Sequence, residues 1–286
     1  MTAKFNSLQD SFELNNGVKI PCVGYGTWRA EDGDQAFKGV LSALEAGYRH
    51  IDTAHIYGNE KSVGDAVKQS NIARGDVFIT SKLWNSVRGE EQTLRAFEAS
   101  LKLLGTDYMD LYLIHWPIPK DYADSWAGAN ASSWRAMESL LREGAVRAIG
   151  VSNFLPHHID KLMETAQVMP AVNQIENHIG YPQQEAVDYC RQKGILPQGW
   201  SPLIQGRLDS GALQGIAKKY GKTPAQVALR WCLDRGVLPL PKSVTPHRIK
   251  ENADIFGFSL TESEIEVLAN LPGCGRRGAH PDEATF

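Results

Sequence analysis

Cysteines are few in this chain and show no pairing pattern. Cys22, Cys190, Cys232 and Cys274 lie far apart, and no two of them form a CxxC motif. A disulfide framework or a zinc knuckle would need closely spaced cysteines, so we expect reduced, mostly structural thiols.

Long apolar runs and a strong charge imbalance are also absent. The longest apolar stretches, such as Tyr108 to Ile114, are far shorter than the ~20 residues of a membrane-spanning helix. The first ten residues lack the apolar segment and cleavage site of a secretion signal. Thirty Lys plus Arg against 33 Asp plus Glu leave a formal net charge of −3, which offers no general attraction for nucleic acid. We therefore expect a cytoplasmic protein that binds neither nucleic acid nor membranes.

The chain does contain ample material for a large core, with 42% hydrophobic residues among 286. A tight turn at Asn16-Gly17 predicts an N-terminal β-hairpin. After it, short apolar runs alternate with segments of helical period. Eight runs are candidate strands: Cys22 to Gly24, Tyr48 to Asp52, Val77 to Ser81, Tyr108 to His115, Val146 to Val151, Ala171 to Gln174, Ile195 to Trp200 and Val237 to Leu240.

Helix candidates between these runs carry start and stop signals. From Glu90 to Leu104, apolar residues recur every three or four positions, and a glycine follows as a stop. Thr223 with Gln226, and Thr261 with Glu264, have the spacing of reciprocal N-terminal caps. This alternation of strand and helix predicts an α/β fold.

The predicted strands are nearly continuous apolar runs, as is typical of parallel strands covered by helices. Eight strand–helix units in ~250 residues match a TIM barrel. We expect one (β/α)8 TIM barrel domain over residues 1–286, with an N-terminal β-hairpin, an extra C-terminal helix and a tail. The rival fold, an open doubly wound sheet, usually has a glycine-rich turn after its first strand. Gly24 to Arg29 has only a GxG there.

In such a barrel, chemistry takes place at the carboxyl ends of the strands. Side chains able to hydrogen-bond follow every predicted strand from the second onward: Asp52 and then Tyr57, Lys82, His115, Ser152-Asn153, Gln174, Trp200-Ser201 and Lys242-Ser243. Each of these residues could be structural when taken alone. An Asp, Tyr, Lys and His on three successive strand ends, however, form a set that can donate a proton.

The proton donor of this set is Tyr57. A tyrosine titrates near ~10 when unassisted, and a neighbouring cation stabilises its phenolate form. We expect Lys82 to lower the pKa of Tyr57, with Asp52 holding the lysine in place. His115 adds a neutral donor that orients a carbonyl oxygen.

Tyr57 and Lys61 also form a YxxxK string, the catalytic pair of short-chain dehydrogenases, in which Lys61 would be the essential lysine. Tyr57 follows a strand by only five residues, and the glycine-rich cofactor turn is missing. We therefore favour Lys82 and expect Lys61 to be a solvated surface residue.

Other histidines have weaker patterns. His50 and His55 flank Asp52 without the HExxH spacing of a zinc site, so we expect structural histidines and no metal. The pair His157-His158 is expected to be exposed at a helix start.

A basic cluster follows the last predicted strand. Lys242, Arg248 and Lys250 surround a helix start marked by Thr245-Pro246. A helix amino terminus combined with cations is suited to a phosphate group. The alternative is a solvated basic turn.

Several strings match a known family: GYRHIDTAHIYGNE, ITSKLWN, DYMDLYLIHWP, RAIGVSNF, VNQIENH, GWSPL and LPKSVTPHRIKEN. On these strings the chain resembles the aldo-keto reductase family over essentially its full length. Its WSPLIQG loop and AHPDEATF tail are similar to those of bacterial and protozoal members of the 2,5-diketogluconate reductase and prostaglandin F synthase type. The resemblance implies a monomeric barrel that uses NADPH, without a Rossmann fold, to reduce aldehydes and ketones.

The resemblance also implies roles for individual residues. Asp52, Tyr57, Lys82 and His115 match the catalytic tetrad, with Tyr57 as general acid. Trp200 matches the residue that stacks on nicotinamide. The matched cofactor contacts are Thr27, Ser152, Asn153, Gln174, Trp200, Ser201, Leu203, Lys242, Ser243, Arg248, Glu251 and Asn252. The matched substrate contacts are Trp28, Trp84, His115 and Trp116.

Some features depart from the family pattern or stay open. Trp200 stands where many relatives carry tyrosine, although the bacterial subgroup also uses tryptophan. Pro197 removes a ladder donor inside a predicted strand, so we expect it, with Gly199, to disturb the local register. Specificity should lie in the loops Pro117 to Asn130, Gln205 to Ala212 and Pro272 to Phe286. The alternative function is an NADPH-binding sensor or structural protein on the same barrel, without turnover.

Overall fold

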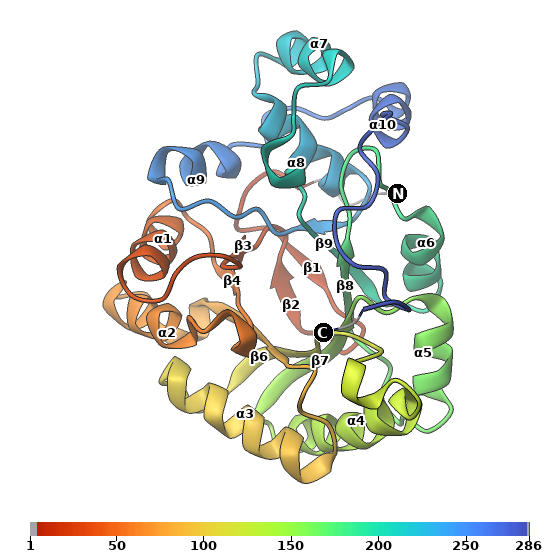
Figure 1. The fold of residues 1–286 in the computed structure, drawn as a ribbon. Coiled ribbons are helices and arrows are strands. Elements are labelled where there is room, and N and C mark those ends of the chain that lie inside the picture. The colour runs from red at the N-terminus through yellow and green to blue at the C-terminus, as the bar shows by residue number, and fades with distance from the viewer. Residues whose placement is uncertain (1–4, 285) are drawn as a thin grey trace.

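The computed structural model describes residues 5–284 and 286 and shows a ring of eight parallel strands surrounded by helices (Figure 1). The ring consists of β3 (Tyr25–Gly26), β4 (His50–Asp52), β5 (Phe78–Leu83), β6 (Met109–Ile114), β7 (Val146–Ser152), β8 (Val172–Glu176), β9 (Leu196–Trp200) and β10 (Leu238–Pro239). The predicted (β/α)8 barrel is therefore confirmed. Two parts of the chain lie outside the described residues: residues 1–4 and Thr285 of the tail. Residues 1–4 begin the segment that is expected to lack a secretion signal.

Each strand pairs in parallel with the next along the chain, and hydrogen bonds between the first and last strands close the ring. Gly24 donates its amide to Pro239 O at 3.1 Å. Gly26 donates its amide to Pro241 O at 2.9 Å. The carboxyl ends of all eight strands therefore meet at one end of the barrel.

Ten α-helices surround the ring in the described part of the chain: α1 (Asp34–Glu45), α2 (Glu60–Gln69), α3 (Glu90–Leu104), α4 (Trp126–Arg142), α5 (Pro156–Met163), α6 (Gln184–Gln192), α7 (Gly211–Tyr220), α8 (Pro224–Asp234), α9 (Pro246–Ala253) and α10 (Glu262–Ala269). The predicted reciprocal caps are confirmed at Thr223 and Thr261. Gly105 ends α3 in the left-handed conformation, at φ 63°, as a glycine stop requires. Within residues 5–284 and 286, no helix is long and apolar enough to span a membrane.

The predicted hairpin is confirmed as β1 (Ser11–Glu13) and β2 (Lys19–Pro21), and it lies across the ring (Figure 1). Leu14 and Ile20 are buried in the cluster of apolar side chains that also contains residues of β5, β6, β7, β8 and β10. Side chains at the hairpin tip donate hydrogen bonds to carbonyls at the starts of β7 and β8. The hairpin thus closes the amino-terminal end of the barrel and leaves the carboxyl end for the site.

The first barrel strand differs from its prediction. It is Tyr25–Gly26, not Cys22 to Gly24. The amide of Cys22 donates to Asp10 O at 2.9 Å, which ties that residue to the N-terminal segment, and pairing with β4 begins only at Tyr25.

Pro197 and Gly199 leave the register of β9 intact, so the expected disturbance was wrong. Successive residues of a strand address neighbours on alternate sides. The amide of Leu196 donates to Ala171 O on the β8 side, so the position of the missing Pro197 N–H faces β10. Pairing between β9 and β10 starts only at Gln198, so no ladder hydrogen bond is lost. A Cβ on Gly199 would lie 3.2 Å from Asn177 O, which shows that the wall there is tightly packed.

Candidate active site

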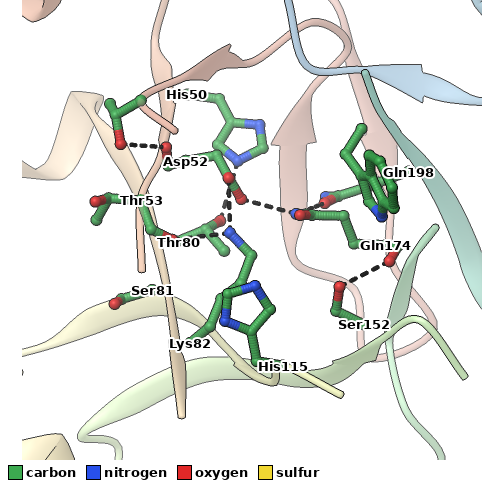
Figure 2. Close-up of polar contacts among 12 residues, drawn as sticks. His50, Asp52, Thr53, Thr80, Ser81, Lys82, His115, Ser152, Gln174 and Gln198 are labelled. Carbon is green, nitrogen blue, oxygen red and sulfur yellow. Dashed lines mark hydrogen bonds and ion pairs between the residues drawn. The ribbon is translucent and has the colours of Figure 1, made fainter. Parts of the chain in front are cut away.

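A buried ion pair between Asp52 and Lys82 lies at the carboxyl end of the barrel (Figure 2). Asp52 of β4 pairs in register with Thr80 of β5, and Lys82 lies two residues further on the same face of β5. Lys82 Nζ therefore lies 2.7 Å from Asp52 Oδ1, and it also donates to Thr53 O at 2.8 Å. Lys82 is 0% exposed and Asp52 4%, so each charge depends on the other for its stability.

Tyr57 lies beside this pair, in the short 3-10 helix η1 (His55–Tyr57) that follows β4. Lys82 Nζ lies 5.2 Å from the centroid of the Tyr57 ring. Lys61 is on the exposed face of α2 and pairs with Asp65 at 2.6 Å. The structure therefore places Lys82, not Lys61, next to the tyrosine.

The pKa of Tyr57 shifts in the opposite direction to the expected one. Burial raises this pKa well above its ordinary value, and the negative charge of Asp52 raises it further. The expectation that Lys82 lowers the pKa was wrong, because desolvation of a phenolate outweighs its attraction to a cation that Asp52 already neutralises. Tyr57 therefore keeps its proton through the neutral pH range.

His115 follows β6 and meets Tyr57 edge to face, with ring centroids 5.8 Å apart. Burial, followed by the positive charges of Lys82 and Arg88, holds the pKa of His115 well below its ordinary value. The imidazole is thus neutral, as expected. Its Nδ1 is enclosed and has no hydrogen-bond partner among the described residues.

Amide side chains link Asp52 to the far side of the barrel (Figure 2). Gln174 Nε2 donates to Asp52 Oδ2 at 2.7 Å and to Gln198 Oε1 at 3.1 Å. Ser152 Oγ donates to Gln174 O at 2.8 Å. The expectation for Gln174 was contact with the cofactor, but its NH2 group is committed to protein partners, so its Oε1 is the side-chain atom left for a ligand.

Asn153 fixes the plane of Trp200. Its Oδ1 accepts a hydrogen bond from Trp200 Nε1 at 2.8 Å, and its Nδ2 donates to His115 O at 2.9 Å. Asn153 has φ 63°, a left-handed conformation that asparagine adopts more readily than most residues. Gly278 packs on the indole so closely that a Cβ would overlap it. Trp200 is therefore a fixed aromatic surface that Asn153 links to the backbone of His115.

Three other expected cofactor residues lie at the ends of β3 and β9. Thr27 is fully buried, and its hydroxyl donates to Asp52 O at 3.0 Å, so it joins β3 to β4. Ser201, with φ 57°, and Leu203 begin the loop between β9 and α7. That loop borders a cavity of about 360 Å³, which Glu251 also lines.

The residues after β10 form a region of positive charge. Lys242 Nζ donates to Arg29 O at 3.0 Å, and partial burial followed by the charge of Arg29 lowers the pKa of Lys242. Ser243 Oγ accepts a hydrogen bond from the amide of Thr245, just before α9. The start of α9 has no side-chain cap, and its first turn contains Arg248. Asn252 is buried further along the same helix. Among the described residues, no carboxylate pairs with Arg29, Lys242 or Arg248.

Two of the three expected substrate tryptophans come together. Trp84 stacks on Phe286, with planes 2° apart and centroids at 6.1 Å, and Trp116 meets Phe286 edge-on at 5.0 Å. Trp84 also meets His115 edge to face. Trp28 is 44% exposed and has no ring contact with this group in the part of the chain described.

The C-terminal tail carries Phe286 over the barrel mouth (Figure 1). The Glu176 carboxylate, buried at the end of β8, accepts the backbone amides of Arg277 at 2.7 Å and Gly278 at 3.0 Å. Asn85 Nδ2 donates to Phe286 O at 3.0 Å. Glu176 was not among the predicted site residues, because the predicted strand ended two residues before it. The available signal was a glutamate inside the apolar run VNQIENH.

The two histidines that flank Asp52 do not converge on a metal site. His50 is fully buried, its Nε2 lies 3.0 Å from Thr80 Oγ1, and burial lowers its pKa to about 3. His55 lies on the rim and pairs with Glu60 at 3.0 Å. Both are engaged in protein contacts, which supports their interpretation as structural histidines.

We expect the free energy of unfolding to fall as the pH is lowered from about 6.5 to about 3, in part through His50. In this pH window His50 is protonated in the unfolded chain but neutral in the folded protein. This difference lowers the free energy of unfolding by up to about 1.4 kcal/mol per pH unit. Urea unfolding at several pH values should show a shallower acid slope in His50→Gln. The exposed-site control His247→Gln should keep the original slope, and equal slopes in the two variants would contradict the assignment.

Another histidine group, His157 and His158 with Asp282, holds the tail. Each Nε2 lies 2.9 Å from Asp282 Oδ1. His158 is buried, contrary to expectation, because its Nδ1 accepts the amide of Leu155 at the start of α5. A histidine whose Nδ1 accepts a hydrogen bond carries its proton on Nε2, where a metal would have to bind. The group therefore fits a tail anchor better than a metal site.

Comparisons with known proteins identify a family and several relatives. The model of the Aldo/keto reductase family matches residues 22–271. The chain is 48% identical over 281 residues to glyoxal reductase of Bacillus subtilis, covering 98% of this chain and 99% of that protein. It is 45% identical to 9,11-endoperoxide prostaglandin H2 reductase of Trypanosoma cruzi, covering 94% of each. The crystal structure of a Bombyx mori aldo-keto reductase in complex with NADP has a TM-score of 0.85 at 34% identity, covering 97% of this chain and 94% of that one.

Proposed function

Because the chain belongs to the aldo/keto reductase family, we propose that it reduces small aldehydes and ketones with NADPH. The observation that carries the proposal is the buried Asp52–Lys82 pair beside Tyr57 and His115. The similarity to a protein named glyoxal reductase supports reduction of carbonyl compounds. We further propose that residues 1–286 act as one catalytic unit, as a monomer in the cytoplasm.

In this proposal the bound cofactor supplies a hydride to the carbonyl carbon. The Tyr57 hydroxyl protonates the substrate oxygen as negative charge develops on it. An alkoxide is a much stronger base than a phenolate, so a tyrosine with a raised pKa still gives up its proton to it. Lys82, held by Asp52, stabilises the phenolate that remains, and neutral His115 donates a hydrogen bond that orients the substrate oxygen.

The residues present fit NADPH. Trp200 offers a face for the nicotinamide, and Asn153 holds that face in place. Ser152 binds the backbone carbonyl of Gln174, whose free Oε1 would accept a hydrogen bond from the carboxamide. Ser201 and Leu203 would hold the pyrophosphate. Glu251, at the 360 Å³ cavity, would contact the adenine, and the uncapped start of α9 would bind the 2′-phosphate. That phosphate would be complemented by three cations that have no carboxylate partner in the described part of the chain: Arg29, Lys242 and Arg248.

The basic region predicts a preference for NADPH over NADH. Replacing Arg248 by Gln should raise the Kd for NADPH by roughly 10- to 100-fold, the loss expected for one hydrogen bond to a charged group. The Kd for NADH, which lacks the 2′-phosphate, should stay within about twofold. Titrations followed by protein fluorescence measure both constants. Arg142→Gln, at an exposed position on α4, is the control, and a parallel loss of NADH affinity would contradict the assignment.

An initial-rate assay tests the proposed function. Oxidation of NADPH is followed with methylglyoxal, a nitrobenzaldehyde, an aldose, a diketogluconate and a quinone, with NADH in parallel. We expect turnover with at least one aldehyde, faster with NADPH than with NADH. Tight NADPH binding without turnover on any reactive carbonyl would instead favour a sensor or structural protein.

A further inference from the structure

Arg88 is a buried arginine without an acidic partner, in the loop between β5 and α3. It is 3% exposed and donates four hydrogen bonds, all to neutral oxygen atoms. The acceptors are Trp84 O, Val87 O and Trp116 O, each at 2.8 Å, and Asn130 Oδ1 at 3.2 Å. No carboxylate among the described residues pairs with it. Burying an unpaired guanidinium is costly, and burial lowers its pKa to about 10.

The guanidinium joins two loops that carry the aromatic pocket walls. Trp84 follows β5 and Trp116 follows β6, and both carbonyls bind the same planar group. Asn130 of α4 extends the link, because its Nδ2 donates to Pro117 O at 2.8 Å. Since the donors of a guanidinium have fixed directions, Arg88 determines how far apart the two loops lie.

The Phe286 ring shows what the space between these walls accepts. It lies parallel to Trp84 and edge-on to Trp116, so the two indoles form a corner in which one aromatic ring contacts both. Phe286 is 48% exposed, so only part of its ring is enclosed there. The spacing that Arg88 maintains is therefore suited to a flat aromatic group.

The charge of Arg88 also acts on His115. Together with burial and Lys82, it holds the pKa of His115 below its ordinary value. A neutral amide could link the two loops, but it could not contribute to this electrostatic effect.

We propose that Arg88 is a positioning residue that sets the separation of Trp84 and Trp116 and thereby favours aryl aldehydes over small aliphatic ones. The inference rests on the proposed function, since it names the substrate class of the same site. Arg88 touches neither substrate nor cofactor in this account. It acts through the two tryptophans and, by its charge, through His115.

The first test is Arg88→Lys, which keeps the charge but cannot bridge four acceptors. We expect the KM for a nitrobenzaldehyde to rise roughly tenfold, as for one lost buried hydrogen bond, with kcat within about threefold. Methylglyoxal is too small to touch both walls, and its kcat/KM should change less than about twofold. The control is Arg135→Lys, because Arg135 of α4 forms a comparable link to a neighbouring element, Glu90 of α3 at 2.6 Å, but on the surface. Equal losses for the two aldehydes, or no loss for either, would overturn the proposal.

The second test removes the charge. In Arg88→Met the pKa of His115 should rise, so the acid limb of kcat/KM for methylglyoxal should move to higher pH, whereas Arg88→Lys should leave it in place. Identical pH profiles for the two variants would contradict the electrostatic part of the proposal. Thermal melting identifies a variant that fails to fold. Asn130→Ala then replaces it as a milder change, and it should also raise the KM for the nitrobenzaldehyde more than the KM for methylglyoxal.

A binding measurement separates this inference from the proposed function. Affinity of the wild-type and Arg88→Lys proteins for the nitrobenzaldehyde, with NADP+ bound, is followed by tryptophan fluorescence. If the wild type binds the aldehyde but turns over no carbonyl, the proposed function fails, and the affinity ratio still decides the role of Arg88. Equal affinities of the wild-type and Arg88→Lys proteins for the nitrobenzaldehyde would overturn the positioning role of Arg88.

Discussion

A Tyr57→Phe variant is expected to lose carbonyl reduction by roughly 100- to 10,000-fold, the usual contribution of a positioned general acid. The Tyr57 ring remains beside Lys82 in the variant, and only the proton donor is removed. The hydroxyl makes no hydrogen bond to another residue in the described structure. NADPH affinity and the midpoint of urea unfolding should therefore stay close to those of the wild type.

The measurement compares initial rates and NADPH titrations of the variant and the wild type. A matched control is Tyr189→Phe, whose hydroxyl donates to Asp160 at 2.6 Å on the exterior. We expect that variant to keep its activity. Near-normal turnover in Tyr57→Phe with cofactor still bound would show that another group protonates the substrate.

A Lys82→Met variant should lose both activity and stability. Removing the ammonium leaves the Asp52 carboxylate buried without a counter-charge, which typically costs about 3–5 kcal/mol. The hydrogen bond from Gln174 Nε2 to Asp52 remains but does not neutralise the charge. Urea unfolding gives the stability loss, and oxidation of NADPH in the presence of methylglyoxal gives the activity loss.

A double variant separates the two effects. Combining Lys82→Met with Asp52→Asn removes both charges, so most of the lost stability should return while turnover stays abolished. Lys61→Met is the surface control, because its exposed pair with Asp65 should be worth no more than about 1 kcal/mol. If the two substitutions destabilise additively, Asp52 and Lys82 do not depend on each other as the structure indicates.

The fold and the placement of the catalytic candidates followed from the sequence for a simple geometric reason. The carboxyl ends of parallel strands meet at one end of a barrel, so Asp52, Lys82 and His115 had to approach one another once the strands were located. The choice of Lys82 over Lys61 needed only two sequence features: the short distance of Tyr57 from the end of its strand and the missing glycine-rich turn.

Properties that depend on enclosure could not be read from the sequence. The direction of the pKa shift of Tyr57 depends on how deeply the phenol is buried and on whether Asp52 already compensates Lys82. The buried position of His158 depends on a hydrogen bond to a backbone amide. Periodicity gives neither the depth of a side chain nor its partner.

Contacts made by the tail and by Arg88 depend on segments distant in sequence. Phe286 reaches Trp84 because Glu176, Asn85 and the pair His157-His158 at Asp282 hold the tail, and all of these partners of the tail lie more than a hundred residues before Phe286 in the chain. Arg88 binds the Trp116 carbonyl from a neighbouring loop. Loop and tail conformations of this kind have no short-range signal, so the pocket walls were the part of the site predicted least well.

The most direct test of the account is product analysis after incubation of the wild-type protein with NADPH and methylglyoxal. The proposed mechanism predicts one alcohol product formed for each NADPH consumed, with turnover slower when NADH replaces NADPH. NADPH bound tightly but not consumed, with no alcohol formed from this or any other aldehyde, would contradict the claim that Asp52, Tyr57, Lys82 and His115 form a working reductase site.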